Sequence, residues 1–229
     1  MSNSLAWEKE YRKPKLVSKD DKPQADTLRF FKFLKKEQKY NLEDKRVLDL
    51  GCGTGRNSNY LAQRHNEVCG IEISRTAIDI ARERARKKDL KVDYILGDIA
   101  KRYDFPDLYF DLVLDVTSSN SLDEEGRSFY LQEVSRVLKN NSYFFVRALA
   151  KDASKNVKNL LKNSPGKEYD TYHIKEMGLT ERVFSKEDFI KMYSKYFKII
   201  KIDKKTSYTS FNGRVYKRNY WIAYLKKSV

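Results

Sequence analysis

Residues 47–55, with the sequence VLDLGCGTG, decide the fold of this chain. The first four residues form an apolar run that only Asp49 interrupts, and glycine follows at positions 51, 53 and 55. Because glycine has no side chain, its backbone can adopt left-handed conformations and come close to a ligand. The stretch therefore predicts a buried strand, a tight turn against a ligand, and the start of a helix.

Strands and helices alternate along most of the chain. Apolar runs predict the strands, and apolar residues at helical spacing predict the helices between them. This alternation predicts an α/β fold in which a parallel sheet has helices on both faces. Asn212-Gly213 indicates a hairpin turn between the last two strands. The expected strands are 46–50, 67–72, 91–96, 110–116, 142–149, 197–202 and 220–225. The expected helices are 24–38, 56–64, 151–161 and three that begin after Ser74, Asp123 and Ser185.

Two segments lack a regular pattern. Residues 1–22 are polar and irregular, although Trp7 and Tyr11 would share one face if the segment were helical. Residues 163–166, Asn-Ser-Pro-Gly, break the helix that precedes them, and we expect residues 167–182 to be irregular.

The composition indicates a single domain spanning residues 1–229, of which 40% are hydrophobic and 34% charged. No run reaches the roughly 20 apolar residues of a membrane helix. The N-terminus also lacks the apolar core of a signal peptide. We therefore expect a cytoplasmic protein that does not enter a membrane.

The cysteines and histidines do not form a metal site in the sequence. Cys52 lies in the glycine turn, Cys69 in the next strand, and His65 and His173 stand apart from them without metal-ligand spacing. No metal is therefore expected. Cys52 is better explained as a small residue in a tight turn than as a nucleophile.

The net charge of +15 is concentrated in the last third of the chain, where residues 151–229 hold 19 basic and 8 acidic residues. A basic face attracts nucleic acid or an anionic substrate. However, 16 of these 19 basic residues are lysines, and they are scattered as on an ordinary solvated surface. Both readings remain open at this point.

Carboxylates follow several strands near the glycine turn, at Asp49, Glu72, Asp98 and Asp115. Parallel sheets bind ligands at the carboxyl ends of their strands. The dinucleotide motif G-x-G-x-x-G would need a third glycine where Arg56 stands, so that motif is not present. A ligand with hydroxyls, an amine and a positive charge suits these carboxylates better than a pyrophosphate does.

The chain resembles the class I S-adenosylmethionine-dependent methyltransferases in the order and spacing of the glycine turn and of four segments that follow it. The resemblance implies a Rossmann-like, doubly wound, mostly parallel seven-stranded sheet with an antiparallel C-terminal strand pair. It also implies an enzyme that uses S-adenosyl-L-methionine and releases S-adenosyl-L-homocysteine. The matching segments are residues 47–55, GIEIS at 70–74, GDI at 97–99, FDLVLD at 110–115 and EVSRVLK at 133–139.

The same resemblance implies roles for individual residues. The glycines would approach the methionine part of the cofactor, and Asp49 would orient the turn or bind the ammonium through water. Glu72 would accept hydrogen bonds from the ribose hydroxyls, and Asp98 from the adenine amino group. The full set of expected cofactor-binding residues is Tyr11, Asp49, Gly51, Cys52, Gly53, Gly55, Glu72, Ile73, Asp98, Ile99 and Asp115.

The acceptor is less clearly indicated. Residues 115–120 lack the Asn/Asp-Pro-Pro-aromatic tetrad of nucleobase amino methyltransferases. The layout is most similar to small-molecule members of the tellurite-resistance and thiopurine types. In these an N-terminal helix with Trp and Tyr covers the cofactor, although Trp7 and Tyr11 would serve equally well to pack on the sheet edge. The implied parts are an N-terminal extension (1–40), a cofactor-binding core (41–150), an acceptor-side lid (151–184) and a C-terminal helix with two strands (185–229).

Candidate acceptor-site residues come from the fifth strand and the lid. Arg147 could bind an acceptor carboxylate or be a solvated edge residue, and His173 could be a general base or a surface histidine. Tyr169, Tyr172 and Arg182 complete the candidates. The favoured function is methyl transfer to a small molecule. An RNA or protein methyltransferase and a non-catalytic cofactor-binding module are the alternatives.

Overall fold

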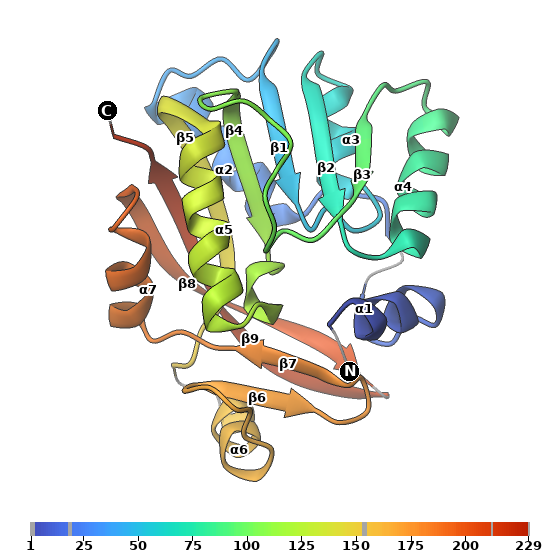
Figure 1. Ribbon diagram of the computed structural model, residues 1–229, viewed down its shortest axis with the longest axis vertical. Helices are drawn as coiled ribbons and strands as arrows, with labels where there is room; N and C mark the ends of the chain where they lie inside the picture. The colour runs from blue at the N-terminus through green and yellow to red at the C-terminus, as the bar shows by residue number, and fades with distance from the viewer. Residues whose placement is uncertain (1–2, 18–19, 153–154, 212, 229) are drawn as a thin grey trace.

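A seven-stranded sheet forms the centre of the molecule in the order β3-β2-β1-β4-β5-β9-β8 (Figure 1). The computed structural model describes residues 3–17, 20–152, 155–211 and 213–228. Strands β1 to β5 are mutually parallel, and β9 is antiparallel to both β5 and β8. The fold class predicted from the sequence is therefore confirmed. The strands are β1 Arg46–Leu50, β2 Glu67–Glu72, β3 Asp93–Leu96, β4 Phe110–Val116, β5 Leu138–Leu149, β8 Lys198–Phe211 and β9 Arg214–Lys226.

Helices cover both faces of this sheet. On one face α2 buries Phe30 against strand residues such as Phe145, α3 buries Leu61 in the same cluster, and α4 buries Ile78 in a neighbouring one. On the other face α5 and α7 bury Tyr130 and Phe189. None of the described helices is long and apolar enough to cross a bilayer. The helices are α1 Asn3–Arg12, α2 Ala25–Glu37, α3 Arg56–Ala62, α4 Arg75–Lys87, α5 Glu124–Val137, α6 Lys155–Asn163 and α7 Lys186–Tyr193.

Three helices begin at the capping residues that the sequence indicates. The Ser74 hydroxyl accepts a hydrogen bond from the Ala77 N–H at 3.2 Å, and the Ser185 hydroxyl accepts one from the Asp188 N–H at 3.0 Å. Asp123 accepts from the Gly126 N–H at 2.8 Å. Each cap satisfies one backbone donor that would otherwise have no partner in the first turn of the helix.

The prediction that residues 167–182 are irregular is wrong. They contain the two-stranded hairpin of β6 (Thr171–Ile174) and β7 (Leu179–Arg182). These strands were not predicted because polar residues occupy much of them, so their sequences contain no apolar run. A bridge between Ala150 and Phe184 ties the end of the hairpin to the main sheet.

The last two strands are also longer than predicted, since β8 and β9 replace the expected 197–202 and 220–225. Their polar halves, rich in lysine, serine and threonine, pair only with each other and project past the sheet. The half-buried face of these outer halves carries mostly polar residues, so it forms no apolar run and the predicted strands stopped short of it. In the predicted hairpin turn, Gly213 has a φ of +73°, whereas Asn212 lies outside the described residues.

Helix α1, β6–β7 and the free half of the β8–β9 hairpin gather beyond the carboxyl ends of the parallel strands (Figure 1). In α1 the rings of Trp7 and Tyr11 are 6.3 Å apart, so the part of the segment 1–22 from Asn3 to Arg12 is helical and places both rings on one face. Glu8 holds α1 to the start of α4, because its carboxylate accepts hydrogen bonds from the hydroxyls of Ser74 and Thr76, each at 2.7 Å.

Replacing Glu8 with alanine should release α1 from α4 without unfolding the sheet. Losing both hydroxyl contacts should raise the population of the open helix by about tenfold. Trypsin cleavage after Arg12 should then be faster by a similar factor. The matched control is Glu83→Ala on α4, which removes only an exposed pair with Lys87. Equal cleavage rates in the two variants would contradict the role given to Glu8.

Candidate functional site

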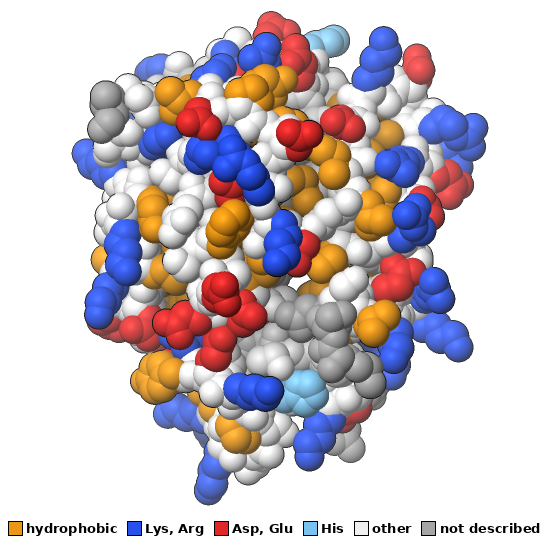
Figure 2. Space-filling model, viewed as in Figure 1, with side chains coloured by type: hydrophobic (Ala, Val, Ile, Leu, Met, Phe, Trp, Pro, Cys, Tyr) orange, Lys and Arg blue, Asp and Glu red, His pale blue; other side chains and the backbone are white. Residues whose placement is uncertain are grey.

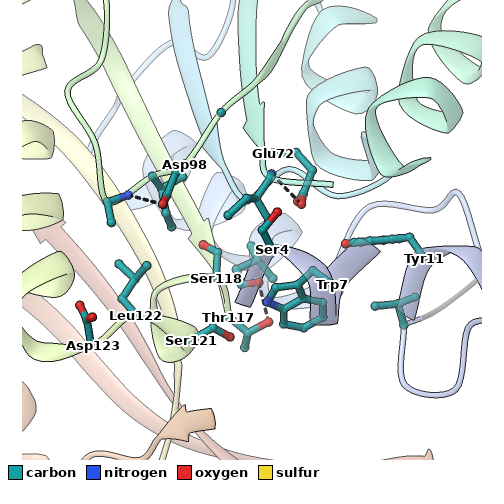
Figure 3. Close-up of a pocket in the computed structure, with 17 residues that line it drawn as sticks. Ser4, Trp7, Tyr11, Glu72, Asp98, Thr117, Ser118, Ser121, Leu122 and Asp123 are labelled. Atoms are coloured by element: carbon teal, nitrogen blue, oxygen red, sulfur yellow. Dashed lines mark hydrogen bonds between the residues drawn. The ribbon is translucent and has the colours of Figure 1, made fainter. Parts of the chain in front are cut away.

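Two neighbouring cavities lie at the carboxyl ends of the parallel strands. The first, of about 490 Å³, extends from the glycine turn past the ends of β2, β3 and β4 to the start of α5 (Figure 3). The second, of about 390 Å³, extends from the same turn toward β5, β7 and the β8–β9 hairpin. Trp7, Tyr11, Gly51 and Thr117 line both. The two cavities therefore meet between α1 and the glycine turn.

The glycine turn has the left-handed backbone that its sequence predicts. The φ angles of Gly51 and Gly53 are +64° and +55°. A Cβ on Gly51 would stand 2.3 Å from the Cβ of Ser118, and one on Gly53 would stand 2.6 Å from the hydroxyl of Tyr11. Side chains at these positions would therefore be strained and would occupy the space between the turn and its neighbours.

Glu72, at the end of β2, is 5% exposed and fixes the glycine turn. One carboxylate oxygen accepts from the Gly53 N–H at 3.0 Å. The other accepts from the N–H groups of Ile73 and Ser74 at 2.8 and 2.9 Å. Burial raises the pKa of Glu72, although these three backbone donors oppose the shift. The carboxylate also lines the first cavity, where Figure 3 shows it beside α1.

Asp49 lies beneath the turn and is 1% exposed. Its carboxylate accepts a hydrogen bond from the Ser58 hydroxyl on α3 at 2.6 Å. Burial raises the pKa of Asp49 to about 7, and the nearby carboxylates of Asp115 and Glu72 add to the shift. This group supports the turn from below and is not among the residues that line either cavity.

Some of the other cofactor-binding residues predicted from the sequence line a cavity and some do not. Ile73, Asp98 and Ile99 line the first cavity, and Cys52 lines the second. Asp98 accepts from the Ala100 N–H at 2.8 Å, as Figure 3 shows. Gly55 and Asp115 line neither.

The two that line neither have contacts inside the fold instead. Asp115 is fully buried and accepts hydrogen bonds from the hydroxyls of Ser118 and Tyr130. Gly55 caps the start of α3 in a left-handed conformation. Both shape the wall of the site from behind.

Arg147, at the end of β5, lines the second cavity and is not a solvated edge residue, since only 11% of its side chain is exposed. Its guanidinium lies 3.3 Å from the centre of the Tyr220 ring and donates to Asp26 at 3.2 Å. The side chain is thus held in one orientation toward the cavity.

Tyr172, Glu181 and Arg218 form a buried network at the far wall of the second cavity. Tyr172 donates to Glu181 at 2.7 Å, and Arg218 donates to both, at 3.2 Å to the tyrosine hydroxyl. Burial alone would lower the pKa of Arg218, but the charge of Glu181 outweighs it and raises that pKa. Glu181 and Arg218 line the cavity.

The remaining lid candidates lie elsewhere. His173 follows Tyr172 on β6 and so points to the opposite side, where its Nδ1 is 3.1 Å from the Thr180 hydroxyl. Both Tyr172 and His173 line a third cavity. Tyr169 is 71% exposed, and Arg182 lies 3.9 Å from Asp188. Neither of these two lines any of the three cavities.

Sequence reasoning missed several residues of the site. Thr117 and Ser118 line the first cavity just after β4 and could have been found from their place at a strand end. Glu181 and Arg218 had no such signal, because they are 37 residues apart and meet only through the two hairpins.

The first cavity fits the cofactor that the sequence resemblance implies. Its described lining residues include three carboxylates, Glu72, Asp98 and Asp123, and no lysine or arginine. Such a lining favours a cationic ligand and disfavours a pyrophosphate. Glycine at positions 51 and 53 lets Ser118 and Tyr11, two other residues of the cavity wall, pack directly against the backbone of the turn.

Comparisons with known proteins agree with this geometry. Residues 47–141 match a family described as "Methyltransferase domain". A fatty-acid O-methyltransferase of Mycolicibacterium smegmatis is 37% identical over 45% of this chain, and the chain spans 37% of that protein's length. An uncharacterized methyltransferase of Schizosaccharomyces pombe is 31% identical, with 45% of this chain and 71% of that protein covered.

The crystal structure of an S-adenosylmethionine-dependent methyltransferase from Methanosarcina mazei superposes with a TM-score of 0.73. The two sequences are 25% identical, and the superposition covers 84% of this chain and 97% of the Methanosarcina mazei chain. The cofactor is S-adenosylmethionine. Together with the fold and the first cavity, these relatives establish that the chain belongs to the class I S-adenosylmethionine-dependent methyltransferases.

Proposed function

We propose that this protein transfers a methyl group from S-adenosylmethionine to a small-molecule acceptor, and that the accepting atom is an oxygen. The observation that carries this proposal is the second cavity, which meets the cofactor cavity at the glycine turn. Its volume of about 390 Å³ suits a small acceptor. The fatty-acid O-methyltransferase relative supports oxygen as the accepting atom.

In this proposal the cofactor occupies the first cavity. The backbone of Gly51 and Gly53 approaches its methionine part, and Asp49 holds the turn from below. Glu72 binds the ribose hydroxyls with the oxygens that already fix the turn, and Asp98 binds the adenine, with Ile73 and Ile99 beside the ring. Tyr11 and Trp7 cover the point where the two cavities meet.

The bound cofactor supplies a methyl carbon that the sulfonium has already activated for in-line displacement. The protein's task is then to place the acceptor atom in line and to exclude water. Orientation of this kind contributes about 7–11 kcal/mol to rate acceleration. A general base is needed only where the acceptor must lose a proton. The walls of the second cavity, including Arg147 and the residue pair Glu181 and Arg218, would do the placing.

RNA is a second candidate acceptor, favoured by a groove of about 330 Å³ between α2 and β8. Figure 2 shows the face of the molecule that carries α5. On this face lysine and arginine side chains are scattered among acidic ones, so it gives little support to a nucleic-acid surface. The acidic lining residues of the groove are Asp26, Glu37 and Asp203, and its basic ones are Arg29, Lys32, Lys36, Lys201, Lys204 and Lys205.

A methyl-transfer assay on a fractionated cell extract tests these proposals. Labelled S-adenosylmethionine is incubated with the protein and with the small-molecule, RNA or protein fraction. We expect label in the small-molecule fraction, and mass spectrometry should place the methyl group on oxygen. Label in RNA alone would support the second candidate. No label in any fraction, with cofactor binding intact, would overturn both. The cytoplasmic location and the resemblance to tellurite-resistance and thiopurine enzymes stay predictions.

A further inference from the structure

The second cavity continues into a third one of about 240 Å³, because Leu16, Thr209 and Arg218 line both. The third cavity lies between β6, α6 and the end of the β8–β9 hairpin. A molecule that extends from the glycine turn past Arg218 would enter it. Its apolar and aromatic side chains are Leu16, Leu160, Tyr172, Ile174, Met177, Phe211 and Tyr216, and its charged or titratable ones are His173, Lys175, Glu176 and Arg218.

The second cavity differs from the first in the sign of its charges. Its described charged lining residues are Arg56, Arg147, Arg218 and Glu181, whereas those of the first cavity are all acidic. A cationic cofactor and an anionic acceptor would thus each find an opposite charge in their own cavity.

The positive charge of Arg147 is not fully offset by its partner. Asp26, which is 4% exposed, also pairs with Lys205 at 3.0 Å and with Arg29. One carboxylate therefore faces three cations. Arg218 pairs with Glu181, which also accepts a hydrogen bond from Tyr172, and 15% of the Arg218 side chain is exposed. Both guanidiniums are thus shielded from water, where an additional anion is bound more strongly than at the surface.

We infer that the acceptor is an amphiphilic carboxylate. Its carboxylate binds Arg147 and Arg218 in the second cavity, and its hydrocarbon chain passes Thr209 into the third. The planar guanidinium forms paired hydrogen bonds with a carboxylate, and the apolar walls bury the chain. This inference rests on the proposed function, because it takes the second cavity as the acceptor's place.

Binding of simple probes tests the inference separately from methyl transfer. Isothermal titration calorimetry on the full chain saturated with S-adenosylhomocysteine compares octanoate, octanol and butanoate. Octanoate should bind about tenfold more tightly than octanol, through hydrogen bonds with charged partners, and at least tenfold more tightly than butanoate, through the longer buried chain.

Two variants separate the head of the acceptor from its tail. Arg218→Met combined with Glu181→Gln removes both charges, so that no buried carboxylate is left unpaired. It should reduce the preference for octanoate over octanol, because Arg147 remains as the only one of the two proposed carboxylate partners. Thr209→Trp narrows the passage and should weaken octanoate about tenfold more than it weakens butanoate. Lys198→Met, which removes an exposed charge from the far end of β8, is the control and should change neither affinity.

Equal binding of octanoate and octanol by the unmodified protein would overturn the inference. So would a Thr209→Trp variant that binds butanoate and octanoate as the unmodified protein does. If octanoate binds as expected but no extract fraction accepts a methyl group, the proposed function fails while the binding site stands.

Discussion

Replacing Glu72 with alanine should weaken the binding of S-adenosylhomocysteine by about a hundredfold or more. The variant loses the carboxylate proposed to hold the ribose. It also frees the N–H of Gly53, which the carboxylate holds at 3.0 Å, and those of Ile73 and Ser74. The turn that carries the glycines would then lose its fixed position. Isothermal titration calorimetry measures the change.

The control for this prediction lies on the same strand. Glu67, at the other end of β2, is exposed and pairs with Arg46 at 3.2 Å, so Glu67→Ala should leave the affinity unchanged. Glu72→Gln keeps the shape of the side chain but turns an amide N–H₂ toward backbone donors, and its affinity should lie between the two. Thermal unfolding confirms that each variant is folded. Tight binding by folded Glu72→Ala would remove Glu72 from the proposed cofactor site.

The central sheet was predictable because its strands are buried on both faces. The bounds of β1, β2 and β4 match the sequence prediction at both ends, since a strand covered by helices on each side is a continuous apolar run. Strands β6 and β7 and the outer halves of β8 and β9 carry polar residues and are paired outside that covered region. Their sequences therefore lack the signal on which the prediction of the other strands depended.

The same difference separates the two halves of the site. Gly51, Glu72 and Asp98 could be placed together from the sequence, because parallel strands end at one edge of a sheet. The acceptor side depends on how two hairpins fold over that edge. Alternation along β6 decides that Tyr172 meets Glu181 while His173 faces Thr180 on the other side, and this could be known only once the strand was recognised.

The stability of the protein should fall as the pH rises from about 4 to about 7, by roughly 4 kcal/mol on account of Asp49 alone. Burial raises the pKa of Asp49 in the folded state to about 7, against an ordinary value of 3.8. Between these values the folded protein retains a proton that the unfolded chain has released, so rising pH favours unfolding. Urea unfolding at a series of pH values measures the change.

Asp49→Asn should remove most of this pH dependence, because an amide does not titrate and the Ser58 hydroxyl can still donate to its oxygen. Glu72 shifts in the same direction, so the difference between the two proteins isolates Asp49. Asp93→Asn, at an exposed position on β3, is the control and should follow the unmodified protein. Parallel stability curves for the unmodified protein and Asp49→Asn would contradict the shifted pKa.

The same carboxyl should make cofactor binding depend on pH. A cation near Asp49 favours its ionised form, so S-adenosylmethionine must displace a proton wherever Asp49 is still protonated. Affinity should therefore rise between about pH 5 and pH 7 and then level off, because above the folded pKa of about 7 no proton remains to be released. Asp49→Asn should bind more weakly at pH 8 and lose this part of the pH profile. An unchanged profile in that variant would mean that Asp49 supports the turn without sensing the charge of the cofactor.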